Sequence, residues 1–191
     1  MAKLIYTAIA SLDGYVEDAE GGFVWAAPDD EVLAYVNDLE RSVGTYLYGR
    51  RMYQTMAIWE SVTDDEQAAV TSDFARIWRA AEKIVYSRSL AEPVTSRTRI
   101  LGEFDPFEVR RLKESAATDL SIGGAQLAGQ AIAAGLVDEL RLFLGPVIVG
   151  GGKPALPSGV HTRLELLGER PFRGGVTYLR YRVNYTPEAE R

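Results

Sequence analysis

The chain has 191 residues, and 47% of them are hydrophobic, a share that excludes a disordered chain. Its formal net charge is −6 and its pI is near 5, which argues against a nucleic-acid partner. It has no cysteine and one histidine, His161, so disulfides, thiolate sites and two-histidine sites are excluded and no metal is expected. No apolar stretch reaches the roughly 18 residues of a membrane span, and the N-terminus lacks the apolar core of a signal peptide, so we expect one cytoplasmic, non-membrane domain over residues 1–185 and a frayed tail at 186–191.

Strands and helices alternate along the first part of the chain. Runs of apolar and β-branched residues predict strands, and apolar residues at helical spacing predict helices. In chain order we predict a buried strand (3–10), a turn (11–14), a long loop (15–28), a helix beginning at Asp29 and Asp30 (to about 43), a short strand (45–48) and a short helix opening at Gly49. Loops as long as residues 15–28 are usually functional in compact domains.

The second part of the chain continues this alternation and then becomes richer in strands. We predict a helix (64–81), two strands (83–86 and 97–101), a helix from Pro106 (to about 116), a strand (120–122) and a helix that ends near Gly135. Residues 139–144 and 176–184 alternate between apolar and polar, as in half-buried strands. The order predicts an α/β fold with a central sheet that is parallel early and has an antiparallel C-terminal edge.

Small and cationic residues stand where three predicted strands end. Gly123-Gly124 joins a strand to a helix, where the backbone can approach a pyrophosphate, although a tight structural turn explains the pair about equally well. Arg50 and Arg51 follow Gly49, and Ser87-Arg88 follows the 83–86 strand. Ligands of open α/β sheets bind at the carboxyl ends of strands, and arginine suits phosphate. The junctions therefore predict a nucleotide site and favour NADP over NAD.

Two further features carry less weight. Gly150-Gly151-Gly152-Lys153-Pro154 has the wrong spacing for a Walker motif, and Pro154 stands where a Ser or Thr would meet magnesium, so we interpret the segment as a flexible loop. His161 lies in a Gly/Pro-rich region and is assigned no role.

Two carboxylates are candidates for chemistry. Trp25, Pro28 and Asp30 form the spacing Trp-x-x-Pro-x-Asp, in which Asp30 can hold a heterocyclic ring, although helix capping by Asp29 or Asp30 is the simpler interpretation. Asp13 in Leu-Asp-Gly is a candidate of the same kind, with turn formation as its alternative.

Taken together, the motifs resemble the RibD C-terminal family, the reductase half of the bifunctional riboflavin-biosynthesis deaminase/reductase. They run in the family's order from about residue 3 to residue 183. They are Ser11-Leu12-Asp13-Gly14-Tyr15-Val16, Gly49-Arg50-Arg51-x-Tyr53, Lys83-Ile84-Val85-Tyr86-Ser87-Arg88, Gly123-Gly124-Ala125-x-Leu127, Gly135-Leu136-Val137-Asp138-Glu139-Leu140-Arg141-Leu142 and Pro146-Val147-Ile148-Val149-Gly150-Gly151-Gly152. The resemblance implies the three-layer dihydrofolate reductase-like fold, with a mixed, mostly parallel sheet and helices on both faces.

The resemblance also implies an NADPH-dependent reductase. Carried over by motif, Gly49, Arg50, Arg51, Ser87 and Arg88 would hold the adenosine and its 2′-phosphate. The pyrophosphate would be held by Gly123, Gly124, Ala125 and Gln126. The segment 11–16 would lie near the nicotinamide, and the Trp25–Asp30 spacing is similar to that of dihydrofolate reductases, whose aspartate contacts the pterin.

Two departures from the family pattern leave the substrate open. RibD-type reductases often carry Lys after Leu-Asp-Gly, where this chain has Tyr15, and these residues contain no Cys and no His-x-Glu pattern of the zinc deaminase half. The first hypothesis is hydride transfer from NADPH to a small heterocyclic or ribosyl substrate such as 5-amino-6-(5-phosphoribosylamino)uracil, with Asp30 or Asp13 on the proton path. The alternatives are dihydrofolate reduction and a nucleotide-binding module without turnover. We also expect a homodimer, because the apolar strand within residues 140–149 would otherwise be a bare edge.

Overall fold

The structure of the chain is a computed structural model that describes residues 1–63 and 68–185. Its centre is an eight-stranded sheet in the order β5-β4-β3-β6-β1-β7-β10-β9. The strands are β1 (Leu4–Ser11), β3 (Val43–Gly49), β4 (Glu82–Tyr86), β5 (Thr98–Leu101), β6 (Asp119–Gly123), β7 (Glu139–Gly145), β9 (Arg163–Pro171) and β10 (Thr177–Asn184). All neighbours from β5 to β7 pair in parallel, and β10 and β9 complete the sheet as antiparallel strands.

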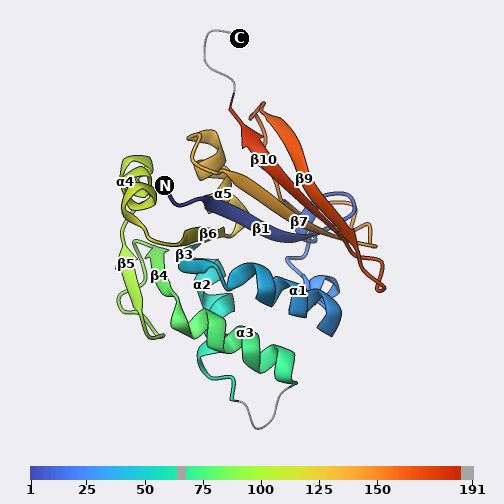
Figure 1. The fold of residues 1–191 in the computed structure, drawn as a ribbon, viewed down its shortest axis with the longest axis horizontal. Helices are drawn as coiled ribbons and strands as arrows, with labels where there is room; N and C mark the ends of the chain where they lie inside the picture. The colour runs from blue at the N-terminus through green and yellow to red at the C-terminus, as the bar shows by residue number, and fades with distance from the viewer. Residues whose placement is uncertain (64–67, 186–191) are drawn as a thin grey trace.

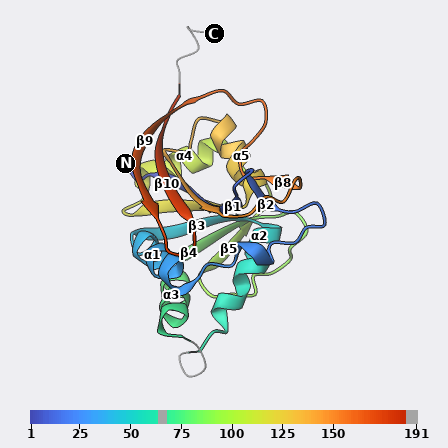
Figure 2. The ribbon, with the colours of Figure 1, turned by 90° about the vertical axis from the view of Figure 1, so that its right-hand side faces the viewer.

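Helices cover both faces of this sheet, which gives three layers (Figure 2). α1 (Asp30–Glu40), α2 (Arg50–Met56) and α3 (Ala69–Ala80) lie on one face, and α4 (Pro106–Ser115) and α5 (Ala125–Ala133) lie on the other (Figure 1). Two 3-10 helices, η1 (Val24–Ala26) and η2 (Ala57–Glu60), and a small sheet of β2 (Tyr15–Glu17) with β8 (Lys153–Pro154) complete the fold. The predicted α/β class, the parallel sheet and its antiparallel C-terminal edge are confirmed.

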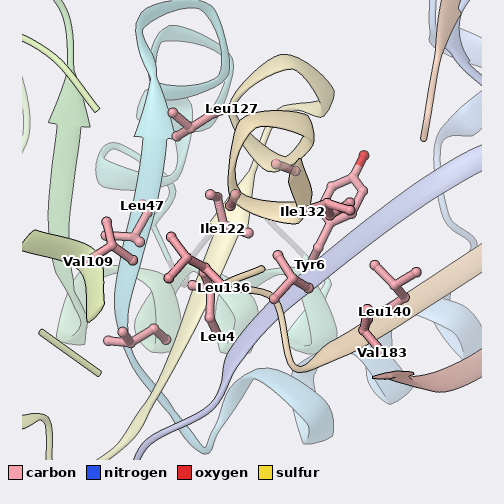
Figure 3. Packing of buried hydrophobic residues seen from close by; sticks show 14 of the residues in the cluster. Leu4, Tyr6, Leu47, Val109, Ile122, Leu127, Ile132, Leu136, Leu140 and Val183 are labelled. Carbon is pink, nitrogen blue, oxygen red and sulfur yellow. The ribbon is translucent and has the colours of Figure 1, made fainter. Parts of the chain in front are cut away.

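The core between the sheet and α5 contains residues of β1, the strand that lies between β6 and β7. Leu4 and Tyr6 of β1 pack with Ile122 of β6 and with Leu127 and Ile132 of α5 (Figure 3). A strand that is covered on both faces needs apolar residues at nearly every position, and β1 has the sequence Leu-Ile-Tyr-Thr-Ala-Ile-Ala-Ser. The opposite face of the sheet packs against α1 and α3 through a second and a third apolar cluster.

Several predicted bounds differ from the structure. The helix predicted from residue 64 is seen from Ala69, and residues 64–67 of that prediction lie outside the described residues, as does the predicted tail at 186–191. The predicted loop 15–28 contains β2 and η1. β9 was not predicted, because an edge strand that is exposed along most of its length lacks the apolar alternation of a buried one.

The prediction that the strand within residues 140–149 is a bare edge was wrong. β7 lies between β1 and β10 and is buried on both faces. Its charged residues mislead the sequence analysis, because they are neutralised inside the fold. Glu139 accepts hydrogen bonds from Arg180 at 2.8 and 3.0 Å and from Lys3, and Arg141 lies beside it. The free edges of the sheet are β5 and β9.

This buried ionic group leads to a stability prediction. Burial acts to raise the pKa of Glu139, but the hydrogen bonds from Arg180 and Lys3 outweigh it and lower the pKa to about 2. A carboxyl whose pKa is lower in the folded state stabilises the fold above its unfolded pKa, and that contribution is lost as the pH falls toward 2. We expect Glu139→Gln to lower the free energy of unfolding at neutral pH by about 1–3 kcal/mol, because the charge-assisted hydrogen bonds that Arg180 and Lys3 make to a buried carboxylate are lost.

Denaturant unfolding as a function of pH measures this effect. The difference from wild type should shrink as the pH falls through the same window. Glu165→Gln is the matched control, since Glu165 pairs with Arg182 at 2.7 Å in an exposed position, where an ion pair contributes little. Equal losses of unfolding free energy in Glu139→Gln and Glu165→Gln would contradict the prediction that Glu139 contributes more to stability than an exposed ion pair.

Candidate functional site

A large cavity opens at the carboxyl ends of the parallel strands. Its volume is about 1170 Å³, and its lining comes from β1, β3 and β6, from the N-terminal parts of α2 and α5, and from α1, η1 and η2. This is the position at which open α/β sheets bind ligands. Within the described residues, no group of three or more acidic or histidine side chains is arranged to hold a metal ion, and no helix is both long and apolar enough to cross a membrane.

The glycine pair forms the junction between β6 and α5 at this cavity. Gly124 is the N-cap of α5 with φ +90°, and no side chain caps the helix. The N–H groups of the first turn are therefore available to a ligand, and Gly124, Ala125 and Gln126 line the cavity. A side chain at Gly123 would meet the Tyr48 ring at 2.6 Å. Both glycines thus have a packing or backbone reason to be present, besides any ligand.

The arginines predicted to bind phosphate come to the same cavity. Gly49 is the N-cap of α2, and Arg50, Arg51 and Arg88 line the wall beside it with exposed side chains. Arg50 donates from Nη1 to the Ser89 hydroxyl at 2.9 Å. Arg88 pairs with Glu103 at 2.5 Å. The cluster is positive and solvent-facing, as an anionic group requires.

Ser87 is the one member of the predicted cofactor set that does not line the cavity. Its hydroxyl accepts hydrogen bonds from the backbone N–H groups of Ser89 at 3.2 Å and of Leu90 at 3.0 Å. The structure therefore places Ser87 in the turn that carries Arg88, where it holds the backbone of the turn in place.

The predicted substrate and catalytic residues Trp25 and Asp30 lie next to residues that line the cavity, namely Val24, Ala26 and Pro28. Asp30 is an exposed residue in the first turn of α1, and the side-chain cap of that helix is Asp29, which accepts from the Val32 N–H at 2.9 Å. Trp25 is half-buried in η1 and its indole Nε1 has no partner among the described residues. Neither Asp30 nor Trp25 is among the residues that line the cavity.

Asp13 is tied into the neighbouring loop. Its carboxylate accepts from the N–H groups of Val149 at 3.2 Å and Gly150 at 2.8 Å, which joins the turn after β1 to the glycine-rich segment. The Ser11 hydroxyl and these two backbone groups lower the pKa of Asp13, so it is ionised at neutral pH. A residue with all of these interactions acts as a structural acceptor and is a poor proton donor.

The glycine-rich segment places β8 against β2 at the mouth of the cavity. A side chain at Gly152 would collide with the Glu17 carbonyl oxygen, so only glycine allows this approach. Lys153 then pairs with the Glu17 carboxylate at 2.6 Å, and both residues line the cavity.

A buried acidic residue that lines the cavity is Glu40, which the sequence analysis missed. It follows Leu33 and Val36 on the stripe of α1 that faces the sheet, and it is only 4% exposed. Burial raises the pKa of Glu40, and the nearby Tyr46 hydroxyl and Arg141 offset this only in part. The sequence contained one indication of this position, because Glu40 follows Leu33 and Val36 at helical spacing. A glutamate in the last turn of a helix is, however, usually exposed to solvent.

Comparisons with known proteins identify the family of the chain. The family described as "RibD C-terminal domain" matches residues 2–178, which confirms the resemblance inferred from the motifs. The uncharacterized protein YyaP of Bacillus subtilis (strain 168) is 28% identical over 185 residues, which are 95% of each chain.

Solved structures show the same fold. A pyrimidine reductase-like protein from Corynebacterium diphtheriae has a TM-score of 0.69 at 15% identity, over 97% of this chain and 93% of that one. Acinetobacter baumannii RibD has a TM-score of 0.70 at 16% identity, over 96% of this chain and 58% of that one. Dihydrofolate reductase from Enterococcus faecalis, complexed with NADP(H), has a TM-score of 0.62 at 15% identity, over 96% and 97%. The dihydrofolate reductase-like fold is thereby confirmed.

Proposed function

We propose that this chain, which belongs to the RibD C-terminal domain family, is an NADPH-dependent reductase of a small heterocyclic or ribosyl substrate. The observation that carries the proposal is the composition of one cavity. It contains the uncapped N-terminus of α5, the cluster of Arg50, Arg51 and Arg88, and an apolar part under α1, which we call the chamber. The similarity of the fold to RibD and to an NADP(H)-bound dihydrofolate reductase supports it. The first candidate substrate that we propose is 5-amino-6-(5-phosphoribosylamino)uracil.

The residues present fit a dinucleotide. The first-turn N–H groups of α5 suit the pyrophosphate, and Arg50, Arg51 and Arg88 suit a 2′-phosphate, since arginine forms charge-assisted hydrogen bonds with phosphate. A volume of about 1170 Å³ accommodates more than a single ring. When bound, NADPH supplies the hydride.

The chain's own contribution is orientation and the exclusion of water. Phe23 and Val24 at η1 and Ile58 at η2 are exposed apolar side chains at the cavity. Such side chains can cover a ligand and keep water from the reacting atoms. Hydride transfer depends on this positioning more than on a strong acid.

Oxidation of NADPH, followed by absorbance, tests the proposal with 5-amino-6-(5-phosphoribosylamino)uracil and with dihydrofolate as parallel substrates. Turnover of the first substrate supports the riboflavin-type reaction. Turnover of dihydrofolate alone supports the second candidate, which rests on the same fold. Tight NADPH binding without turnover of either would favour a nucleotide-binding module. A cytoplasmic location stays a prediction.

We also propose a homodimer, on grounds that differ from the sequence argument. The free edge β9 exposes Leu164 and Leu166, and an exposed apolar edge strand is prone to pair with another chain. A two-fold pairing of this edge would cover it. We expect light scattering at micromolar concentration to give twice the chain mass of 21.0 kDa. Leu166→Lys should shift the mass toward the monomer, and a monomeric wild type would contradict the proposal.

A further inference from the structure

Three polar atoms on the chamber side of the cavity are buried and lack a hydrogen-bond partner among the described residues. They are Thr7 Oγ1 of β1, Glu40 Oε2 of α1 and Tyr46 Oη of β3. All three residues line the cavity, and Glu40 and Tyr46 are only 4% and 3% exposed. The Tyr46 hydroxyl and the Glu40 carboxyl lie close enough to interact with each other, so these side chains form one polar group in an otherwise apolar part of the cavity. Buried polar atoms are nearly always paired, so the positions that remain open in this group suit a ligand with hydrogen-bonding groups of its own.

We propose that Glu40, Tyr46 and Thr7 bind the cyclic-amide edge of a neutral, planar heterocycle, with the Glu40 carboxyl both donating and accepting a hydrogen bond. This inference rests on the proposed function, because the heterocycle belongs to the molecule that the reductase reduces. It names a substrate anchor that is distinct from Asp30 and Asp13.

The position of the anchor suits a ring deep in the site. Tyr48 pairs in register with Gly123 at the glycine junction, and Tyr46 precedes Tyr48 by two residues on the same strand. Two residues of a strand span about 7 Å, roughly the width of one heterocycle. The Tyr46 ring is fixed in place by parallel stacking on Tyr48, with centroids 5.5 Å apart and an interplanar angle of 7°.

The walls around the anchor are apolar and largely aromatic. They come from α1, η2, α3 and β7, and so surround the chamber on the helix side of the sheet. They are Leu33, Val36, Trp59, Phe74 and Phe143. Flat apolar walls with a few converging polar atoms are the usual arrangement for a planar ligand.

The charge around Glu40 favours a neutral ligand. Burial raises the pKa of Glu40, which favours the protonated form with one O–H donor and one C=O acceptor. That pair matches the C=O and N–H of a cyclic amide. Arg141, which pairs in register with Thr7 on the neighbouring strand, would repel an amidine cation at the same place.

Binding of two small probes, measured by calorimetry or ligand-observed NMR without cofactor, tests the anchor. The probes are uracil, a neutral cyclic amide, and 2,4-diaminopyrimidine, an amidine. Glu40→Gln keeps a donor and an acceptor at nearly the same shape, whereas Glu40→Met keeps the length and removes both. We expect uracil affinity to stay close to wild type in Glu40→Gln and to fall about tenfold or more in Glu40→Met.

Asp38→Asn is the matched control, because Asp38 is an exposed carboxylate on the same helix and should not change uracil binding. Tyr46→Phe removes only a hydroxyl and should weaken uracil binding severalfold, which keeps the test open if Glu40→Met fails to fold. Unchanged uracil affinity in Glu40→Met and Tyr46→Phe would overturn the inference. So would tighter binding of 2,4-diaminopyrimidine than of uracil.

The pH dependence gives a readout that a purely structural role would not change. The titratable groups that face Glu40 are Arg141 of β7 and Tyr46 and Tyr48 of β3. None of them changes charge between about pH 5 and 8, because arginine stays protonated and burial raises the pKa of both tyrosines.

The affinity of the wild-type protein for uracil should therefore fall as the pH rises through the pKa of Glu40. The affinity of Glu40→Gln should not change with pH. A wild-type affinity that does not change with pH, together with tight binding of 2,4-diaminopyrimidine, would overturn the inference. NADPH binding and turnover are measured separately. If they fail while the probes still depend on Glu40, then the proposed function is wrong and the anchor stands.

Discussion

The double variant Arg50→Gln, Arg51→Gln is expected to bind NADPH roughly a hundredfold more weakly, since each charge-assisted hydrogen bond to phosphate contributes about 1.5–3 kcal/mol. Its affinity for NADH should be nearly unchanged. Both arginines line the cavity beside the N-terminus of α2, and NADH lacks the 2′-phosphate that they are proposed to hold. Fluorescence titration of the two cofactors measures the ratio directly.

A charge-matched control separates this effect from general electrostatics. Arg110 of α4 and Arg163 of β9 are exposed and lie outside the cavity, so their double replacement by glutamine changes the net charge equally. We expect it to leave both affinities unchanged. Parallel losses for NADPH and NADH in the Arg50, Arg51 variant would place these side chains away from the 2′-phosphate.

The sequence was sufficient to predict most of the sheet because the parallel strands are short, apolar and separated by regular helices. β1 shows this, since it is buried on both faces and is a nearly continuous apolar run. The junctions at Gly49 and Gly123 were also predictable, because glycine at the end of a buried strand, followed by a helix, is typical of a ligand-binding turn. These junctions are brought to one cavity by the parallel topology.

The errors come from charged residues whose surroundings are set by distant parts of the chain. β7 was interpreted as a half-buried edge strand because its leucines alternate with residues such as Glu139 and Arg141. Lys3 and Arg180, which are far away in sequence, neutralise Glu139 inside the sheet. Glu40 was overlooked for the same reason. Its burial depends on strands β1, β3 and β7 lying beneath α1, and no local pattern reports that arrangement.

The role of Asp30 stays a prediction, because spacing alone does not fix the direction in which a side chain points. The Trp-x-x-Pro-x-Asp spacing is present, but the described helix turns Leu33, Val36 and Glu40 toward the cavity and leaves Asp30 exposed. A residue's face on a helix is decided by packing, which a short motif does not contain.

The variant Ala125→Pro is expected to weaken the binding of NADPH and NADH alike, by about tenfold or more, because it removes one N–H donor to the shared pyrophosphate. Ala125 is the first residue of α5, a position where proline fits the helix and where the N–H has no partner within the helix. The loss of affinity should therefore come without a loss of folding. Replacement of Gly124 is less informative, since a side chain at φ +90° strains the backbone whatever the ligand.

Ala125→Ser serves as the matched control, because it alters the side chain at the same position and keeps the backbone donor. We expect it to bind both cofactors as wild type does, and both variants to melt at the wild-type temperature. Unchanged cofactor binding by a folded Ala125→Pro would mean that the N-terminus of α5 does not hold the pyrophosphate. Together with the arginine variant, which should affect NADPH alone, this pair of measurements locates the two phosphate groups independently of each other and of any turnover.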